Sequence, residues 1–218
     1  MIDDYRHKGL RNQLVSELIQ KGIKDPKVLS AIASVPRHLF LDKAFEEWAY
    51  KDQAFPIDCG QTISQPYTVA MQTALLEITE KMRVLEIGLG SGYQASVLVE
   101  MGCKVYSIER FEHLYEKTTK RLTQIGYQQV RTFCGDGFLG LPRFAPFDRI
   151  LITAAIPQVP ECLFDQLKEG GILVAPVNYG LDQMMRKFIK STSEIKQEDY
   201  GMFRFVPMLE GVVKNSIS

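Results

Sequence analysis

A glycine-rich loop is the first feature of this sequence that could do chemistry. Gly88, Gly90 and Gly92 alternate with single residues where an apolar strand pattern over 83–87 gives way to a helix pattern. Glycine lets the backbone approach a ligand closely, and the N-terminus of a helix favours a negatively charged group. The loop therefore predicts a ligand site, although a tight strand-to-helix turn with nothing bound has the same composition.

An acidic residue after the next strand pattern narrows the choice of ligand. Glu109 stands 21 residues after Gly88, at the end of a strand predicted over 104–108. A carboxylate there can accept hydrogen bonds from both hydroxyls of a ribose. The simpler interpretation is a solvated acid at a strand end. A dinucleotide site requires G-x-G-x-x-G, and Tyr93 occupies the third glycine position, which argues against a nicotinamide-dependent oxidoreductase.

Glu86 precedes the loop and completes a different pattern. The run resembles E/D-x-G-x-G-x-G, the first motif of the S-adenosylmethionine-dependent methyltransferases. The resemblance implies that Glu86, Gly88, Gly90 and Gly92 contact the methionine end of the cofactor S-adenosyl-L-methionine.

A third acidic position follows the strand pattern at 130–134. A lone G-D-G such as 135–137 is usually a turn. In the methyltransferases that the loop resembles, an acid here accepts a hydrogen bond from the adenine amino group, and a nearby backbone N–H meets a ring nitrogen. Because this acid comes third in order, again at a strand end, the resemblance implies that Asp136 and Gly137 bind the adenine.

The segment GQTISQPY at 60–67 points to an acceptor. It closely resembles the signature G-Q-T-I-S-x-P of the protein-L-isoaspartate (D-aspartate) O-methyltransferases. The resemblance extends over essentially the whole chain, through VPRH at 35–38, LEIGLGSGYQ at 85–94, FD at 147–148, TAA at 153–155, GG at 170–171 and RFVPM at 204–208. The departures are small: Leu89 replaces a frequent threonine, Asp58-Cys59 replaces a glycine-aromatic pair, and Met208 replaces leucine.

The resemblance implies an enzyme that methylates the free α-carboxylate of L-isoaspartyl and D-aspartyl residues in damaged proteins and peptides. The ester then closes to a succinimide, which hydrolyses partly to normal aspartate, so that methylation initiates repair. A carboxylate is ionised at pH 7 and needs no strong general base. The sequence agrees, because three scattered histidines and four widely spaced cysteines also predict no metal site.

Five residues are candidates for the acceptor side of the site. Ser64 is expected to orient the acceptor carboxylate through its hydroxyl group, with a helix N-cap near residue 66 as the alternative role. Thr62 is a weaker candidate for a ligand contact. Ala154 and Ala155 stand at a sheet end where ligands bind, and small side chains there leave room for a peptide. The family resemblance implies that Val206 binds the peptide, while a plain edge strand ended by proline fits equally well.

The elements that must position these residues alternate between strand and helix. Strand patterns cover 83–87, 104–108, 130–134, 149–154 and 171–177, and helix patterns cover 93–101, 111–125 and 160–167. This alternation predicts an α/β fold with a doubly wound, mainly parallel sheet of the methyltransferase type. Strand-like runs at 184–189 and 203–208 predict antiparallel strands at the C-terminal edge. The first 50 residues predict a helical cap, with a second helix opening at Asp25 and Pro26, and 51–66 predicts a loop.

We therefore expect one methyltransferase domain over 1–218, with a helical cap and substrate loop (1–80), a cofactor-binding core (81–180) and C-terminal edge strands (181–218). The 26 basic and 26 acidic residues balance, which argues against a dedicated nucleic-acid binder. No uncharged run approaches the about 20 residues of a membrane helix, and the charged N-terminus predicts no secretory signal. The expected protein is a cytoplasmic monomer whose partners are isoaspartyl-containing proteins and peptides. A methyltransferase for another carboxylate or a small molecule, and a non-catalytic binding module on the same fold, are the alternatives.

Overall fold

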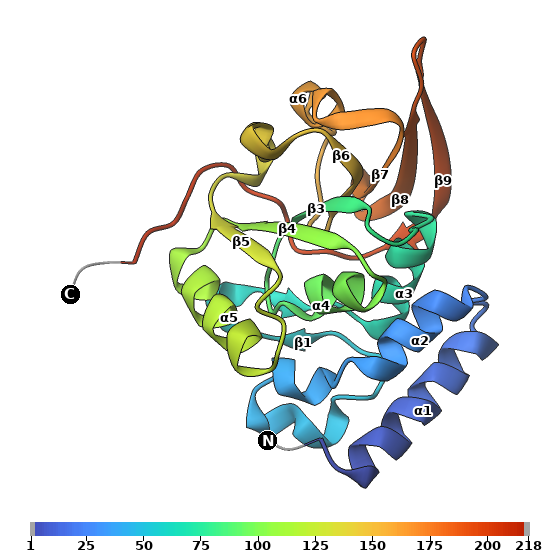
Figure 1. Cartoon of the computed structure of the whole chain (residues 1–218), viewed down its shortest axis with the longest axis vertical. Helices are drawn as coiled ribbons and strands as arrows, with labels where there is room; N and C mark the ends of the chain where they lie inside the picture. The colour runs from blue at the N-terminus through green and yellow to red at the C-terminus, as the bar shows by residue number, and fades with distance from the viewer. Residues whose placement is uncertain (1–2, 216–218) are drawn as a thin grey trace.

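The central element is a sheet of seven strands. A computed structural model describes residues 3–215. The strands are ordered β5-β4-β3-β6-β7-β8-β9 (Figure 1). Their bounds are β3 Arg83–Ile87, β4 Lys104–Glu109, β5 Arg131–Cys134, β6 Phe147–Ile152, β7 Leu167–Tyr179, β8 Asp182–Lys190 and β9 Ile195–Phe203. Strands β3 to β7 pair in parallel, whereas β8 and β9 pair antiparallel. The predicted fold class is confirmed.

Helices cover both faces of this sheet. The helices are α1 Tyr5–Gln20, α2 Pro26–Ser34, α3 Pro66–Leu75, α4 Tyr93–Glu100, α5 Glu112–Gln124 and α6 Glu161–Asp165. Successive strand residues point to opposite faces: Val84 packs into the cluster that includes α1 and α2, and Leu85 packs into the cluster that includes Leu163 of α6. Figure 1 shows α3, α4 and α5 on one side of the strands and α6 on the other. No helix within residues 3–215 is long and apolar enough to cross a membrane.

The N-terminal helices follow the capping signals in the sequence. Asp25 is the N-cap of α2, where its side chain accepts a hydrogen bond from the Lys27 N–H at 2.8 Å, and Pro26 is the first helical residue. Within the predicted cap, Lys43–Trp48 form a 3₁₀ helix. Because the apolar side chains of α1 and α2 share one cluster with those of the sheet, the helical cap lies directly against the core.

The segment predicted as a loop contains two short strands and supports α3. Strands β1 (Phe55–Pro56) and β2 (Thr62–Ile63) pair antiparallel. The predicted alternative role of Ser64 as a helix cap is wrong, since the N-cap residue is Gln65 and its side chain makes no capping bond. Asp52 provides the cap instead. Its carboxylate accepts the Tyr67 N–H in the first turn of α3 at 2.7 Å and the Gln65 Nε2–H at 2.9 Å. Ser64 is therefore not needed to cap the helix.

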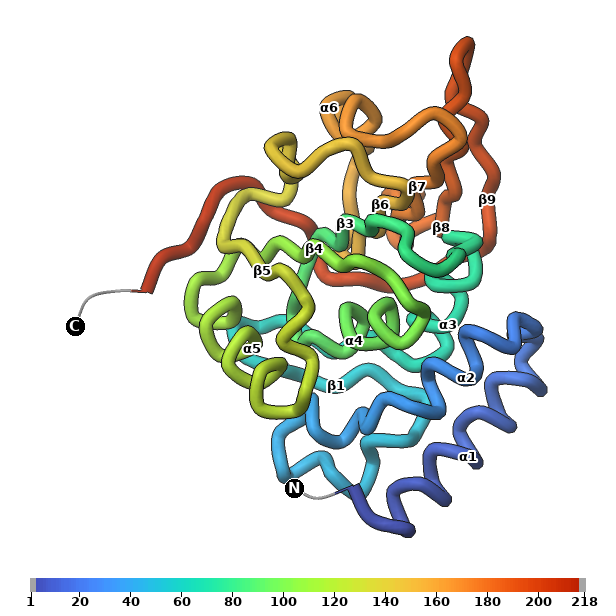
Figure 2. Tube along the Cα trace, in the orientation of Figure 1, coloured from blue at the N-terminus to red at the C-terminus, as the bar shows by residue number. Residues whose placement is uncertain are grey.

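The C-terminal part corrects the sequence prediction. The strand expected at 203–208 is wrong, since β9 covers Ile195–Phe203 and residues 204–215 form an irregular segment, here called the C-terminal strap. The strap crosses the carboxyl ends of the parallel strands (Figures 1 and 2). It bonds to Ala155 on both sides, through the Val206 carbonyl at 2.8 Å and the Met208 N–H at 2.7 Å. The sequence did not predict strand β9, because this edge strand is polar, mostly exposed and without apolar alternation.

Candidate active site

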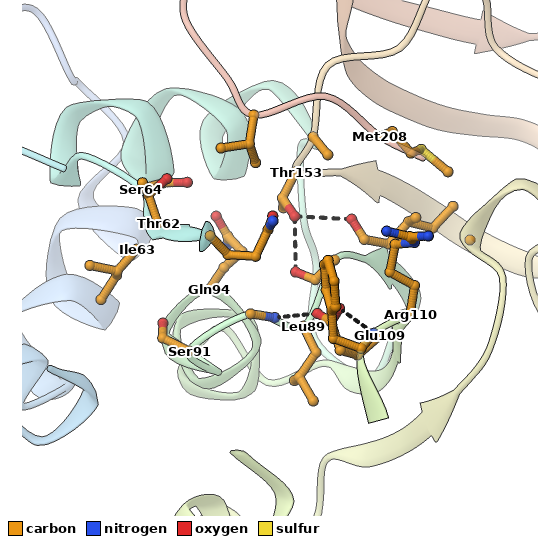
Figure 3. Close-up of a pocket in the computed structure, with 18 of the residues that line it drawn as sticks. Thr62, Ile63, Ser64, Leu89, Ser91, Gln94, Glu109, Arg110, Thr153 and Met208 are labelled. Atoms are coloured by element: carbon orange, nitrogen blue, oxygen red, sulfur yellow. Dashed lines mark hydrogen bonds between the residues drawn. The ribbon is translucent and has the colours of Figure 1, made fainter. Parts of the chain in front are cut away.

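A pocket lies at the carboxyl ends of β3, β4 and β6, where an open parallel sheet usually binds its ligand. Figure 3 shows the side chains around it. The lining comes from five segments of the chain and two separate residues: residues 61–64, 87–91 with 93–94, 108–111, 153–154, the strap residues 206–209, and Val69 and Gly137. Residues that are distant in sequence thus meet at one edge of the sheet, as the glycine loop and Glu109 predicted.

The Glu109 carboxylate is held rigidly in this pocket. The residue is only 6% exposed. Its Oε2 accepts a hydrogen bond from the Gly90 N–H at 2.9 Å, and its Oε1 accepts one from the Phe111 N–H at 3.1 Å. Each oxygen retains a further lone pair for a ligand donor. The solvated strand-end interpretation therefore does not describe Glu109, and the carboxylate can take two hydroxyl groups.

The glycine loop is shaped by close packing. Gly88 has a φ of 102°, and a Cβ atom there would lie 2.3 Å from Thr153 Oγ1. Gly92 has a φ of 86°, and a Cβ atom would lie 2.9 Å from the Thr118 methyl group of α5. Gly88 and Gly90 line the pocket, whereas Gly92 lies outside the lining. Of the three predicted glycines, Gly88 and Gly90 thus face the ligand space, and Gly92 lets α4 pack near α5.

Glu86 lies outside the pocket lining, on β3. Its side chain is fully buried, accepts a hydrogen bond from the Ser107 hydroxyl, and has a second oxygen without a partner among residues 3–215. Burial, together with the nearby Glu109 charge, raises the pKa of Glu86 to about 8. Glu86 is therefore mainly protonated at neutral pH, and it supports the loop from within the core.

Asp136 and Gly137 occupy different places. Gly137 lines the pocket, and a Cβ atom there would lie 2.4 Å from the Ile87 side chain. Asp136 lies outside the lining, with Oδ1 accepting the Phe138 N–H at 2.9 Å and Oδ2 accepting the Gly211 N–H of the strap at 2.7 Å. Its carboxylate thus anchors the strap at the end of the pocket where an adenine contact was expected.

A groove adjoins the pocket beside Thr62 and Ser64, two of the residues expected on the acceptor side. It is lined by Ala54, Thr62, Ser64, Gln65, Tyr67, Thr68, Thr153, Asp182 and residues 200–206, and we call it the acceptor groove. Thr62, Ser64, Thr153 and Val206 line both the pocket and this groove. Val206 belongs to the strap, not to the edge strand that was the alternative.

The two predicted alanines have different surroundings. Ala154 lines the pocket. Ala155 is buried and holds the strap through its backbone N–H and carbonyl groups. Only Ala154 therefore faces ligand space, whereas Ala155 places the strap residues that do.

Sequence reasoning missed several pocket residues. Thr153 comes directly after β6, and Glu109 is the last residue of β4, so the position of Thr153 at a strand end was an available signal. Its hydroxyl lies 2.9 Å from the carbonyl oxygens of both Ile87 and Gly88. Gln94 stands inside the matched glycine motif but had no assigned role. Figure 3 places Gln94 beside Thr62, on the side of the pocket away from Glu109.

One cluster elsewhere has the residue types of a metal site. The possible ligand atoms of Asp3, His7 and His38 lie within 4.8 Å of one another, although the histidines are far apart in sequence. Arg11 donates to both Asp3 oxygens at 3.0 Å, and the two imidazoles stack with centroids 3.8 Å apart at 7°. Stacked rings direct their lone pairs in parallel, so they do not converge on one ion.

The buried Glu86 carboxyl predicts a pH dependence of stability. Its pKa in the folded state is above the ordinary value of 4.5, so the unfolded chain releases this proton first as the pH rises. The contribution of Glu86 to the free energy of unfolding therefore falls between pH 4.5 and about 8, with a slope of at most about 1.4 kcal/mol per pH unit. Glu86→Gln removes this slope, so urea unfolding should show the variant gaining on the wild type from pH 5.5 to pH 8. An unchanged difference at the two pH values would contradict the assignment.

Comparison with known proteins confirms the family resemblance. The family model described as protein-L-isoaspartate(D-aspartate) O-methyltransferase matches residues 9–213. The protein-L-isoaspartate O-methyltransferase of Cytophaga hutchinsonii is 58% identical over 210 residues, which cover 96% of this chain and 95% of that protein. The protein of the same name from Christiangramia forsetii is 53% identical over 210 residues, covering 96% and 99%.

Solved structures agree with the sequence comparison. A structure named protein-L-isoaspartate O-methyltransferase has a TM-score of 0.82 and 32% identity, covering 90% of this chain and 65% of that one. A Plasmodium falciparum protein in complex with S-adenosyl-L-homocysteine shares the fold with a TM-score of 0.80 at 22% identity, covering 91% and 98%. This chain belongs to the protein-L-isoaspartate(D-aspartate) O-methyltransferase family.

Proposed function

We propose that this protein transfers a methyl group from S-adenosyl-L-methionine to the free α-carboxylate of L-isoaspartyl and D-aspartyl residues in damaged proteins and peptides. The observation that carries the proposal is the junction of two spaces. The pocket that contains Glu109 and the acceptor groove meet at Thr62, Ser64, Thr153 and Val206. A methyl donor and a peptide can therefore meet at one place.

The pocket residues fit the cofactor. Both Glu109 oxygens are fixed by backbone N–H groups and can accept the two ribose hydroxyls. Gly88 and Gly137 both line the pocket, and a Cβ atom would clash with Thr153 at the first position and with Ile87 at the second, so glycine is required at both. When bound, S-adenosyl-L-methionine supplies a methyl group on a positively charged sulfur, which becomes a neutral thioether after transfer.

Ser64 is the residue that we assign to the acceptor carboxylate. Asp52 caps α3 in its place, so the Ser64 hydroxyl is free to donate to an oxygen of the substrate. The carboxylate is already ionised and needs no base. Orientation of the two reactants is then the main contribution of the protein.

The strap forms one wall of the reaction space. Its residues 206–209 line the pocket, and Val206 also lines the acceptor groove. Methyl transfer from a cation to an anion cancels charge, so a wall that reduces the access of water favours the step.

The later chemistry belongs to the product. The methyl ester carries a better leaving group than the carboxylate, so the neighbouring backbone nitrogen closes a succinimide that hydrolyses partly to normal aspartate. The protein thus begins repair and does not need to complete it. Cytoplasmic location, a monomeric state and the absence of a nucleic-acid partner stay predictions.

Two peptides that differ at one residue test the function. Methyl transfer from labelled cofactor should give base-labile label on the isoaspartyl peptide and none on the peptide with normal aspartate. Equal labelling of both would indicate a less selective carboxyl methyltransferase. Cofactor binding without label on either would favour another acceptor or a non-catalytic binding module.

The ribose assignment predicts the behaviour of Glu109→Ala. Loss of hydrogen bonds to a charged group should weaken cofactor binding by about 1–3 kcal/mol, measured by titration calorimetry. Glu100→Ala is the matched control, because Glu100 bonds to Tyr127 outside the pocket. Unchanged affinity in Glu109→Ala would contradict the ribose role.

The acceptor assignment predicts that Ser64→Ala lowers turnover and leaves cofactor affinity and unfolding free energy nearly unchanged. Asp52→Ala is the contrasting variant. It removes the cap of α3 and should cost about 1–2 kcal/mol of stability in urea unfolding. Full activity in Ser64→Ala would remove Ser64 from the mechanism.

A further inference from the structure

Gln94 is a buried amide that the function described so far does not use. It lies in the first turn of α4, is 7% exposed and lines the pocket. Its Nε2 atom donates a hydrogen bond to Thr73 Oγ1 of α3 at 3.0 Å. The side chain thus connects the helix after the glycine loop to the helix that follows Ser64.

The Thr73 hydroxyl fixes which way the amide points. Thr73 is fully buried, and its one hydroxyl hydrogen is donated to the Val69 carbonyl at 2.7 Å. Thr73 Oγ1 can therefore only accept from Gln94, so the NH₂ group of Gln94 must face Thr73. The amide oxygen consequently has a set direction, away from Thr73.

This oxygen, Gln94 Oε1, accepts no hydrogen bond from any residue within 3–215. A buried acceptor without a partner is unfavourable unless a ligand or water supplies a donor. Gln72 shows that the feature alone does not mark a site: its Oε1 is also unpartnered, but Gln72 is outside the pocket lining. Gln94 differs because it borders ligand space.

The inference rests on the proposed function, because its hydrogen-bond donor belongs to the proposed cofactor. Of the donors of that cofactor, the α-ammonium group is the one that has no partner assigned so far. In the proposed function the ribose hydroxyls bond to Glu109 and the adenine lies beside Gly137. Figure 3 places Gln94 with Thr62, Ser64 and Ser91, on the other side of the pocket from Glu109 and Met208. The methionine end belongs on that side. The helix N-terminus attracts its carboxylate, whereas its α-ammonium needs an acceptor.

We propose that Gln94 Oε1, held in direction by Thr73, accepts a hydrogen bond from the α-ammonium group at the methionine end of the cofactor. Gln94 is then a binding residue that selects a cofactor with a free amino group. Thr73 acts through Gln94 and is a positioning residue.

Titration calorimetry with two ligands tests this assignment. The ligands are S-adenosyl-L-homocysteine and its deaminated analogue, in which hydrogen replaces the α-amino group. Gln94→Met keeps the length of the side chain and removes the acceptor. We expect the variant to lose about 10- to 100-fold in affinity for S-adenosyl-L-homocysteine, the range for a hydrogen bond to a charged group, and to bind the deaminated analogue as the wild type does.

Gln72→Met is the matched control, since it alters a second buried glutamine whose Nε2 bonds to the Ile152 carbonyl. It should retain wild-type affinity for both ligands, with melting temperatures recorded for both variants. The same selective loss in Gln72→Met would overturn the proposal, because the effect would then travel through the core. An equal loss for both ligands in Gln94→Met would also overturn it and assign Gln94 to packing.

Two further outcomes separate this proposal from the proposed function. Unchanged S-adenosyl-L-homocysteine affinity in Gln94→Met, with a raised KM for an isoaspartyl peptide, would overturn the ammonium contact and give Gln94 to the acceptor. A wild-type protein that bound neither ligand would overturn the cofactor assignment and the proposal together.

Discussion

The buried carboxylate of Glu109 connects the parts of the molecule that receive the ligand. It ends β4 and accepts N–H groups from Gly90, in the loop after β3, and from Phe111, at the start of α5. Two neighbouring parallel strands place these groups side by side, because their carboxyl ends share one edge of the sheet. The hydrogen bond from Gly90 to Glu109 thus fixes the glycine loop relative to the carboxylate that is proposed to bind the ribose.

The strap adds the second constraint, since it couples the cofactor side to the acceptor side. It starts after β9, bonds to Ala155 beyond β6, and reaches Asp136 beyond β5. Residues 206–209 thereby line the pocket, and Val206 lines the acceptor groove as well. One irregular segment thus forms part of both binding spaces. The antiparallel edge strands β8 and β9 matter for the reaction because they lead the chain into this segment.

Sequence reasoning succeeded where local patterns determine structure. The glycine loop, Glu109 and the Asp25 cap follow from spacing and short-range hydrogen bonds, and the structure has them in the expected places. It failed where long-range contacts decide. Asp52 caps α3 by accepting the N–H of Tyr67, a residue 15 positions later in the sequence. Strand β9 is a polar edge strand without periodicity, and the strap has no regular structure that a pattern could indicate. The family motifs predicted Glu86 and Asp136 as cofactor ligands. Only the structure shows that Glu86 is buried in the core and that Asp136 bonds to the strap.

The central claim is that methyl donor and isoaspartyl carboxylate meet at Ser64, between Glu109 and the acceptor groove. A crystal structure of the protein with S-adenosyl-L-homocysteine and an isoaspartyl peptide tests it most directly. The account predicts ribose hydroxyls on Glu109, the sulfur facing the junction of the two spaces, and the free α-carboxylate of the peptide bonded to the Ser64 hydroxyl. A peptide bound outside the acceptor groove, or a carboxylate directed away from Ser64 and the sulfur, would contradict it.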